Sequence, residues 1–305
     1  MGRIEGAVVV TEAQPRRTLA NRATSYYELT KPGIAAFVRI LAGVSFFVAS
    51  QGQPDLFRLL NTMLGTALAT AGALALNQYA ERDVDARMDR TRARPLPSGR
   101  MKPREALGFG ALLLALGVGY LAGTVSWIPS LMAALSAAGY LLVYTPLKSR
   151  SYMATLVGAI PGAIPALIGW TAVTGRIELG GIVLFGIAFL WQLPHVLALA
   201  WLLKEDYARV GFFLTPPTDP SGGRIGRHMV YHSVSLLLLS GFPTLLGLSG
   251  AIYLAGAAVL GFTMLGLTGA AAADMNQARA RRVFLFSLLY QPLLMGLLLL
   301  DTARP

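Results

Sequence analysis

The chain has 305 residues, of which 54% are hydrophobic and only 13% are charged. An ordinary soluble domain carries about 25% charged residues, so this composition excludes that class and indicates a membrane protein. The chain contains no cysteine, which excludes disulfides, a thiolate nucleophile and cysteine-ligated metal sites.

The first 25 residues are polar and of mixed charge, which predicts a flexible cytoplasmic tail rather than a removable signal peptide. Residues 26–305 are predicted to form a single all-α transmembrane domain. Short breaks at residues 126–129 and 248–250 predict tight turns between neighbouring helices. The domain contains nine apolar blocks of about the 20 residues that a membrane-spanning helix needs. These blocks are residues 34–50, 58–79, 104–125, 127–145, 153–173, 179–201, 229–248, 250–270 and 283–300.

Most of the 26 basic residues lie in alternate connections between these blocks. Cytoplasmic loops of membrane proteins carry an excess of Lys and Arg, so this bias predicts a cytoplasmic N-terminus and a C-terminus outside. Much of the basic excess behind the net charge of +11 is thereby explained by membrane topology. No nucleic-acid partner is expected.

Nearly half of the 15 acidic residues lie in two of the predicted cytoplasmic loops. The bias toward basic residues does not require acids there, so we infer that this face of the protein needs negative charge. The first loop follows the second block and the second loop follows the sixth block. Together they contain Glu81, Asp83, Asp85, Asp89, Glu205, Asp206 and Asp219.

The helix of the second block has no proline before residue 95 and is predicted to extend into the first acidic loop. Asn77, Glu81, Asp85 and Asp89 recur on it every fourth residue. Each step turns by only about 40°, so these side chains form one polar stripe, from which Asp83 points away. Carboxyl and amide oxygens suit Mg²⁺, which takes one or two carboxylates together with substrate phosphates.

Arginines near the stripe are suited to binding phosphate oxygens in bidentate fashion. In this interpretation the acids hold a metal ion, the metal ion holds a diphosphate, and the arginines neutralise the remaining charge. The alternative is a solvated loop in which acids and arginines pair as salt bridges four residues apart. The arginines are Arg82, Arg87, Arg90, Arg92 and Arg94.

The sixth block contains residues 191–195 (WQLPH) in its second half and is followed by residues 204–207 (KEDY). On one continuous helix, His195 and Asp206 would share nearly the same face about 16 Å apart. A single buried histidine alternatively packs or forms a hydrogen bond between helices. Both acidic segments end an apolar block, which suggests a weak repeat of about 120 residues around a central cavity open to the cytoplasmic side. An amphiphile with a charged head and a long tail would fit this cavity.

These residues resemble the intramembrane aromatic prenyltransferase superfamily. Asn77, Glu81 and Asp85 match its first N-x-x-x-D/E-x-x-x-D motif, and RPLPSG at residues 94–99 matches the segment that follows. The quinone-type branch usually has a second D-x-x-x-D motif, which residues 204–207 lack, so the resemblance favours the branch of protoheme IX farnesyltransferases, or heme O synthases. Further matching segments are residues 29–32, 144–148, 163–170, 191–195, 204–207 and 281–290.

The resemblance implies Mg²⁺-dependent transfer of a farnesyl group from farnesyl diphosphate to the 2-vinyl group of protoheme IX. The products would be heme O, for respiratory oxidases, and diphosphate. The expected location is the bacterial cytoplasmic (inner) membrane, where membrane lipid surrounds the protein. A downstream heme A synthase is a candidate partner.

The resemblance also implies roles for individual residues, which fall into three groups. The metal-binding and catalytic group is Asn77, Glu81, Asp85 and Asp206. The diphosphate-binding group is Lys31, Arg94, Lys148, Arg150 and Lys204. The heme- or isoprenoid-binding group is His195, Tyr207, Tyr144 and Trp191, with Trp170 as a further aromatic candidate. Aromatic residues near the ends of spans are alternatively interfacial anchors.

Three other functions share some of these sequence features. A prenyltransferase acting on a quinone precursor or chlorophyllide is disfavoured by the missing second motif. A CDP-alcohol phosphotransferase would need D-G-x-x-A-R, which is absent around Ala86 and Arg87. A transporter of an amphiphilic anion shares internal repeats, but its polar groups would be expected near the membrane midplane rather than at one face.

Overall fold

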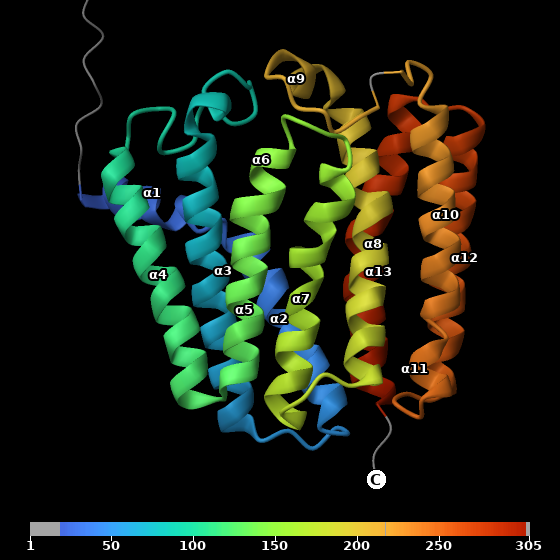
Figure 1. The fold of residues 1–305 in the computed structure, drawn as a ribbon. Coiled ribbons are helices and arrows are strands. Elements are labelled where there is room, and N and C mark those ends of the chain that lie inside the picture. The colour runs from blue at the N-terminus through green and yellow to red at the C-terminus, as the bar shows by residue number, and fades with distance from the viewer. Residues whose placement is uncertain (1–18, 217, 303–305) are drawn as a thin grey trace, which may run out of the picture.

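A computed structural model describes residues 19–216 and 218–302, and this part of the chain is almost entirely helical. Most of the helices run side by side as a bundle, with their connections at two opposite ends (Figure 1). The first half contains α1 (Leu19–Leu29), α2 (Pro32–Ala49), α3 (Leu56–Asp85), α4 (Pro103–Thr124), α5 (Trp127–Ala138), the π-helix η1 (Gly139–Tyr144) and α6 (Thr145–Leu147). The second half contains α7 (Ala154–Thr174), α8 (Leu179–Leu202), α9 (Lys204–Arg209), α10 (Gly223–Leu239), α11 (Phe242–Leu245), α12 (Ala251–Ala273) and α13 (Gln277–Asp301).

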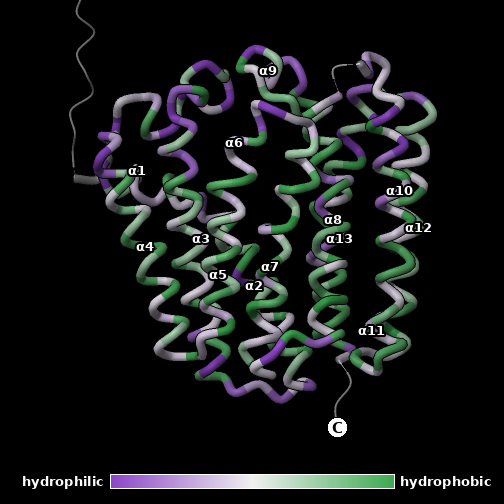
Figure 2. Tube along the Cα trace, in the orientation of Figure 1, coloured by the Kyte–Doolittle hydropathy of each residue, from purple (hydrophilic) through white to green (hydrophobic). Residues whose placement is uncertain are grey.

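Among the described residues, eight helices are long and apolar enough to cross a membrane. In this count α5, η1 and α6 form one span, Trp127–Leu147. The predicted number of nine spans is not confirmed by this criterion, because the seventh block is divided between α10, which has 17 residues, and the four-residue helix α11. The helices are mainly hydrophobic, and hydrophilic residues collect at both ends of the bundle (Figure 2). The chain is therefore a multi-pass membrane protein.

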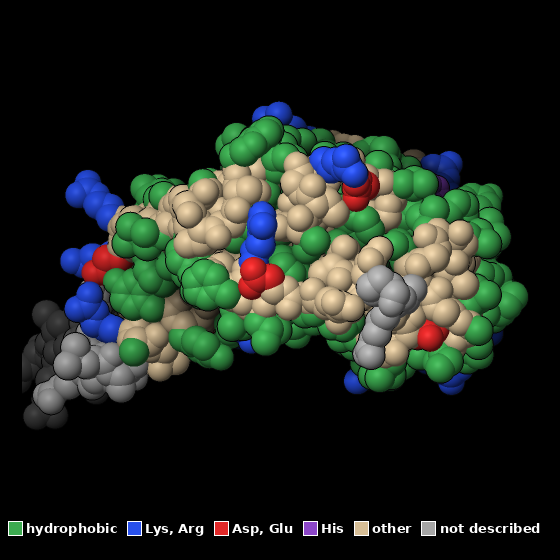
Figure 3. Space-filling view, turned by 90° about the horizontal axis from the view of Figure 1, so that it is seen from below, with side chains coloured by type: hydrophobic (Ala, Val, Ile, Leu, Met, Phe, Trp, Pro, Cys, Tyr) green, Lys and Arg blue, Asp and Glu red, His purple; other side chains and the backbone are tan. Residues whose placement is uncertain are grey.

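The two ends of the bundle differ in charge. The loop after α3 and the helix α9 lie together at one end, which we call the acidic-loop end, and α13 finishes at the opposite end (Figure 1). The opposite face, seen in Figure 3, is covered mainly by hydrophobic and uncharged groups, with a few scattered Lys, Arg, Asp and Glu side chains. Both acidic segments thus lie on one side of the bundle, as the sequence predicts.

Helix α1 lies across the direction of the other helices, near the acidic-loop end (Figure 1). Its Glu28 carboxylate accepts two hydrogen bonds from the guanidinium of Arg100, at 3.0 and 2.6 Å. This ion pair fixes α1 against the segment that precedes α4. Residues 1–18, which make up most of the predicted tail, lie outside the described residues.

Glycines bring the helices around the site into close contact. A Cβ atom at Gly72 of α3 would lie 2.3 Å from the backbone nitrogen of Leu114 in α4. A Cβ atom at Gly169 of α7 would lie 1.9 Å from the carbonyl oxygen of Ala42 in α2. Small residues allow membrane helices to approach so closely that backbones pack directly on each other. The distances between α3 and α4 and between α7 and α2 are therefore fixed by direct backbone packing.

Helix α3 extends beyond the apolar block into the acidic segment, as predicted, but it ends at Asp85 and does not continue to residue 94. The Thr91 hydroxyl donates to the Asp85 carbonyl at 2.8 Å, and this bond satisfies a free carbonyl at the helix end. The chain thereby turns back at this point. Asp89 leaves the stripe as a result and pairs with Arg92 and Arg209 in the loop.

The second expected helix is also interrupted. Helix α8 ends at Leu202 and α9 begins at Lys204, so His195 and Asp206 do not share one continuous helix. The following loop is held by a backbone hydrogen bond of 2.7 Å from Phe213 to the Lys148 carbonyl. This tertiary contact draws the chain over the end of α6. The predicted 16 Å relation along a single helix was therefore wrong.

Candidate active site

The polar stripe on α3 has the helical register that the sequence predicts. Asn77, Glu81 and Asp85 are 1%, 8% and 0% exposed, whereas the Asp83 side chain is 83% exposed. The helix begins at the N-cap Asp55, whose carboxylate accepts from the backbone of Arg58 at 3.1 Å, and it contains no proline. An uninterrupted helix places every fourth side chain on the same face.

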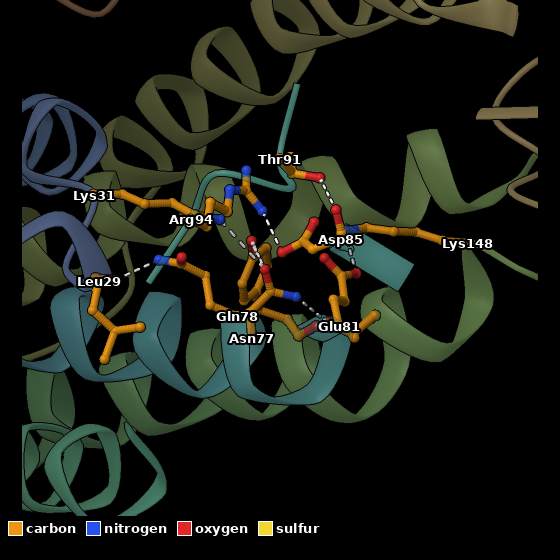
Figure 4. Close-up of polar contacts among 11 residues, drawn as sticks. Leu29, Lys31, Asn77, Gln78, Glu81, Asp85, Thr91, Arg94 and Lys148 are labelled. Carbon is orange, nitrogen blue, oxygen red and sulfur yellow. Dashed lines mark hydrogen bonds and ion pairs between the residues drawn. The ribbon is translucent and has the colours of Figure 1, made fainter. Parts of the chain in front are cut away.

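Each residue of the stripe contacts a cation from another segment (Figure 4). Lys31 Nζ lies 3.5 Å from Asn77 Oδ1. Lys148 Nζ donates to Glu81 Oε1 at 2.7 Å, and Arg94 donates to Asp85 Oδ2 at 2.6 Å. These six residues come from the α1–α2 junction, α3, the loop after α3 and the end of α6. We call them the stripe cluster: Lys31, Asn77, Glu81, Asp85, Arg94 and Lys148.

Asn77 is oriented by two residues for which the sequence analysis gave no role. The Tyr140 hydroxyl donates to Asn77 Oδ1 at 3.2 Å. The Asn77 amide nitrogen donates to Thr145 Oγ1 at 3.0 Å. With both ends of the amide engaged, its oxygen is held beside Lys31 and its nitrogen is turned away. Tyr140, Tyr144 and Lys148 are spaced by four residues, and this spacing was the sequence signal that could have indicated a second helix face opposite the stripe.

Tyr140 and Thr145 meet through the π-helix η1. The Thr145 hydroxyl donates to the Tyr140 carbonyl, five residues back, at 2.8 Å. Pro146 follows directly and has no N–H to donate to the carbonyl four residues before it, so a wider turn is favoured at this point. π-helical turns are rare and are frequently found at functional sites.

The Asp85 carboxylate has one buried oxygen, Oδ1, for which the described residues offer no hydrogen-bond partner. A buried carboxylate oxygen without a partner carries a large desolvation cost, so a ligand that satisfies it would be strongly favoured. Among residues 19–216 and 218–302, no three Asp, Glu or His side chains gather closely enough to hold a metal ion. The donors that remain are two carboxylates and the Asn77 amide, a set that fits Mg²⁺ when phosphate oxygens and water complete the shell.

The three cations of the stripe cluster repel each other. Burial, together with repulsion from Arg94 and Lys148, lowers the pKa of Lys31 to about 7, although Glu81 and Asp85 oppose this shift. For Lys148, burial also disfavours the charged form, but Tyr144 and Glu81 outweigh it and raise its pKa above the usual value. An anion that entered between these cations would relieve their repulsion.

Lys31 also has an unusual backbone conformation. Its φ of 45° and ψ of 64° are in the left-handed region, directly before Pro32 at the start of α2. A residue before proline normally prefers an extended conformation, so this geometry costs about 1–3 kcal/mol. The strained turn allows the Lys31 ammonium group to reach Asn77. Local strain of this kind clusters at binding sites.

A cavity of about 540 Å³ adjoins the stripe cluster through Tyr140, which donates to Asn77, and Tyr144, whose ring centre lies 4.5 Å from the Lys148 ammonium group. Its wall includes all four predicted aromatic and histidine residues of the third group: Tyr144, Trp191, His195 and Tyr207. Most of the remaining lining is apolar, from α2, α7 and α8, with Leu288 from α13. The polar cluster and the apolar cavity therefore meet, as an amphiphilic substrate would require.

His195 has a defined orientation in this wall. Its ring stacks between Trp191, with centroids 5.6 Å apart, and Phe284, with centroids 4.9 Å apart. Its Nδ1 lies 2.8 Å from the Ser287 hydroxyl. One ring nitrogen is bound to Ser287, and the part of the chain that the structure describes offers no hydrogen bond to the other, which can therefore bind a ligand.

Other predicted residues lie outside the stripe cluster. Arg150 is exposed, and the Lys204 ammonium group lies 3.9 Å from the centre of the Trp201 ring. Asp206 accepts from Arg209 at 3.4 Å. The same guanidinium contacts Asp89, so these charges join the two acidic loops.

The structure also shows where Trp170 and the arginines near the stripe lie. Trp170 donates to Glu178 at 3.1 Å, at the end of the bundle opposite the acidic loops, and is not part of the cavity wall. Of the arginines near the stripe, Arg94 is the one that contacts it among the described residues. Arg82 instead donates to the Tyr79 carbonyl at 2.8 Å.

The class that this fold and site define is a polytopic membrane protein with a metal-compatible acidic cluster above an apolar cavity. The model of the UbiA prenyltransferase family matches residues 36–290, and the chain belongs to this family. It is 42% identical over 288 residues to a protoheme IX farnesyltransferase of Solibacter usitatus, covering 90% of this chain and 98% of that protein. It is 40% identical over 286 residues to a protoheme IX farnesyltransferase of Myxococcus xanthus, covering 93% and 96%.

Solved structures show the same fold. A structure of digeranylgeranylglyceryl phosphate synthase is 19% identical, with a TM-score of 0.77, and the match covers 92% of this chain and 98% of that one. A UbiA homologue from Archaeoglobus fulgidus, bound to DMAPP and Mg²⁺, is 17% identical, with a TM-score of 0.64 and coverage of 90% and 99%. That neighbour thus combines this fold with a prenyl diphosphate and a divalent metal ion.

Proposed function

We propose that the chain is a protoheme IX farnesyltransferase of the bacterial inner membrane. It transfers the farnesyl group of farnesyl diphosphate to the 2-vinyl group of protoheme IX and forms heme O. Relatives that carry this name are 40–42% identical over at least 90% of the chain. The Asp85 Oδ1 atom supports the proposal from within the structure, because it is a buried metal-type donor without a partner among the described residues.

The stripe cluster would bind the diphosphate head. Asn77, Glu81 and Asp85 are the proposed metal ligands, and bound Mg²⁺ would neutralise charge on the leaving diphosphate. Lys31, Arg94 and Lys148 would donate hydrogen bonds to its oxygens as they leave their present partners. Arg150, Lys204 and Asp206 lie in flanking segments. We propose that they act on the outer side of the head group.

The cavity would hold the reacting groups away from bulk water. As the bond between the farnesyl carbon and the diphosphate oxygen breaks, a bond forms between that carbon and the terminal carbon of the vinyl group. Water then adds to the neighbouring carbon and loses a proton, which gives the hydroxyethylfarnesyl side chain. Positive charge develops on the allylic chain, so an apolar and aromatic wall containing Tyr144 and Trp191 is suited to this step.

His195 and Tyr207 are proposed to position the tetrapyrrole. His195 lines the large cavity, and its Nδ1 is occupied by the Ser287 hydroxyl. Its stacking on Trp191 and Phe284 restricts the ring to one orientation. This role makes His195 a positioning residue for heme rather than a group that takes part in diphosphate departure.

The experiment that tests this function uses the purified full-length protein with farnesyl diphosphate, Mg²⁺ and protoheme. The expected result is release of diphosphate and a tetrapyrrole with the mass of heme O, both abolished by a metal chelator. Parallel reactions with 4-hydroxybenzoate and chlorophyllide distinguish the related prenyltransferases. Binding of both substrates without diphosphate release would contradict the enzyme function and favour a transporter.

We also propose that the acidic-loop end faces the cytoplasm, with the N-terminus on that side and the C-terminus outside. The concentration of basic residues in the loops on that side supports this orientation. Reporter fusions at the C-terminus and in the loop after α3 test it. The loop fusion should be active only with a cytoplasmic reporter, and the reverse result would invert the topology.

A further inference from the structure

A second, smaller cavity lies next to the large one, further from the acidic-loop end. Its volume is about 100 Å³, and α2, α3, α5 and α7 contribute to its wall. On α3, the residues that line the small cavity lie between Thr66 and Leu74. On α7, they lie between Pro161 and Ile168. The two cavities share five residues, which form a common neck: Ile34, Val38, Leu74, Tyr140 and Gly162.

The small cavity continues the stripe along the same face of α3. Ala73, Thr70 and Thr66 line it and stand four, seven and eleven residues before Asn77. These intervals are close to whole turns of an α-helix, so the side chains lie in one row below the Asn77 amide. Tyr140, which donates to Asn77 and orients it in the proposed head-group site, is thus also part of the neck at the entrance to the small cavity.

The wall of the small cavity is mainly apolar, with Thr66, Thr70 and Ser136 as its aliphatic hydroxyl residues. The Thr66 hydroxyl donates to the Thr62 carbonyl at 2.7 Å, and the Ser136 hydroxyl donates to the Pro161 carbonyl at 2.8 Å. These hydroxyls are therefore occupied by backbone groups. Among the described residues, no charged side chain contributes to the lining. Such a surface favours a hydrocarbon over a polar group.

The volume fits one isoprene unit. A cavity of about 150 Å³ in an apolar protein core is known to accept benzene, which has six carbons. The 100 Å³ cavity is correspondingly suited to a five-carbon group. It is far too small for a porphyrin, which leaves the 540 Å³ cavity for the tetrapyrrole.

The distance from the stripe matches three isoprene units. Eleven residues of α-helix separate the levels of Asn77 and Thr66 by about 16 Å. An extended peptide spans about 3.3–3.6 Å per residue, that is, per three backbone bonds. An isoprene unit has four bonds along its chain, so by the same measure it spans about 4.5 Å, and three units span about 14 Å. A farnesyl chain whose head lies at the stripe would therefore end in the small cavity.

Packed side chains form the wall of the small cavity away from the neck. Ala69, Ala133 and Ile168 line it and belong, together with Leu121, to one buried hydrophobic cluster. Ala133 is 3% exposed and Ile168 is 2% exposed. Well-packed interiors do not expand easily to accept additional carbons. This wall can therefore limit the length of a bound chain.

We propose that the small cavity receives the terminal isoprene unit of the prenyl diphosphate, and that Ala133 and Ile168 set the chain length that the enzyme accepts. The inference rests on the proposed function, because it takes the stripe cluster as the site of the diphosphate. It assigns the two substrates to separate spaces that meet at the neck beside Tyr140.

The test compares geranyl, farnesyl and geranylgeranyl diphosphates by displacement of radiolabelled farnesyl diphosphate from the full-length protein with Mg²⁺, and by turnover with protoheme. Ala133→Leu fills the cavity and should raise the preference for geranyl over farnesyl diphosphate by about tenfold or more. Ile168→Ala extends it and should raise the preference for geranylgeranyl over farnesyl diphosphate by a similar factor. Leu135→Phe is the matched control, because Leu135 lies on α5 but is 50% exposed on the outer surface of the bundle.

The outcomes separate the two proposals. Unchanged chain-length preference in both cavity variants, with retained turnover of farnesyl diphosphate, overturns the role of the small cavity and leaves the proposed function intact. If wild type converts no tetrapyrrole, the proposed function fails, while the displacement measurement still decides the chain-length proposal. If Ala133→Leu does not fold, Ala137→Val narrows the same cavity by a smaller volume and is expected to shift the preference in the same direction. A shift as large in Leu135→Phe would contradict the assignment.

Discussion

The ends of α3 and α8 have similar sequences but different surroundings in the structure. Both end an apolar helix with acidic and basic residues at the acidic-loop end (Figure 1). On α3, Glu81 and Asp85 are buried, and each contacts one cation from a different segment. After α8, Asp206 is more exposed and contacts Arg209 on its own short helix.

This difference shows two features that distinguish a binding site from a charged loop. In a binding site the charged side chains are buried, and their ion-pair partners come from other segments of the chain. The Asp206–Arg209 pair closes within one helical turn, as ordinary surface ion pairs do, and such pairs contribute little to stability. The Asp85–Arg94 pair is buried and leaves one carboxylate oxygen without a partner among the described residues. Of the two helix ends, the end of α3 therefore has a buried oxygen, Asp85 Oδ1, that a bound ligand would stabilise.

The largest expected effect is that of Asp85→Asn. The substitution keeps the side-chain volume but removes the charge of a proposed metal ligand, so kcat/KM should fall by about a hundredfold or more. Steady-state kinetics with farnesyl diphosphate and protoheme measures this change. The matched control is Asp83→Asn, two residues away and exposed, which should remain within about threefold of wild type. Equal losses in the two variants would refute the stripe.

A smaller loss is expected for Arg94→Lys. Lysine keeps the charge but cannot present the planar fork of donors that suits phosphate, so KM for farnesyl diphosphate should rise about tenfold. The KM for protoheme should change little. Arg92→Lys, whose side chain is exposed and paired with Asp89, serves as the control. A rise in both KM values would show that Arg94 acts on the fold rather than on diphosphate.

His195→Ala should affect the other substrate. Loss of the stacked imidazole should raise KM for protoheme by about tenfold, while binding of farnesyl diphosphate stays as in wild type. Titration of protoheme under steady-state conditions, combined with farnesyl diphosphate displacement, measures both. His228→Ala removes a histidine from α10, outside the cavity wall, and should leave both values unchanged. An unaltered KM for protoheme in His195→Ala would remove this residue from heme positioning.

The smallest expected effect is that of Asp206→Asn. Because its carboxylate lies in an exposed network with Arg209, kcat/KM should decrease by about threefold. The kinetic assay used for Asp85→Asn gives a direct comparison. A loss as large as that of Asp85→Asn would instead establish Asp206 as a metal ligand and make the two helix ends equivalent in function.

The sequence predicted the shared face of Asn77, Glu81 and Asp85 on α3, because an uninterrupted helix places side chains four residues apart on one side. It did not predict where that helix ends, since the end depends on the Thr91 hydroxyl and on Arg94 folding back to Asp85. The wall formed by Tyr140 and Thr145 was also missed. Their contacts with Asn77 arise from a π-helical turn, which has a different period from the α-helix.

The end of α8 illustrates a second limit. The chain from His195 to Asp206 contains no glycine or proline at the break after Leu202, so local sequence gave no reason to end the helix there. A tertiary contact between Phe213 and Lys148 holds the next segment instead. The cavities likewise depend on packing between helices that are distant in sequence. Their volumes could not be obtained from residue spacing.

The central claim is that the buried oxygens of α3 bind a divalent metal ion together with a prenyl diphosphate. The most direct measurement is Mn²⁺ binding by electron paramagnetic resonance, with farnesyl diphosphate present, for wild type, Asp85→Asn and Asp83→Asn. The account predicts that wild type and Asp83→Asn bind Mn²⁺ alike, and that Asp85→Asn binds it at least about tenfold more weakly. Equal Mn²⁺ affinity in all three proteins would contradict it.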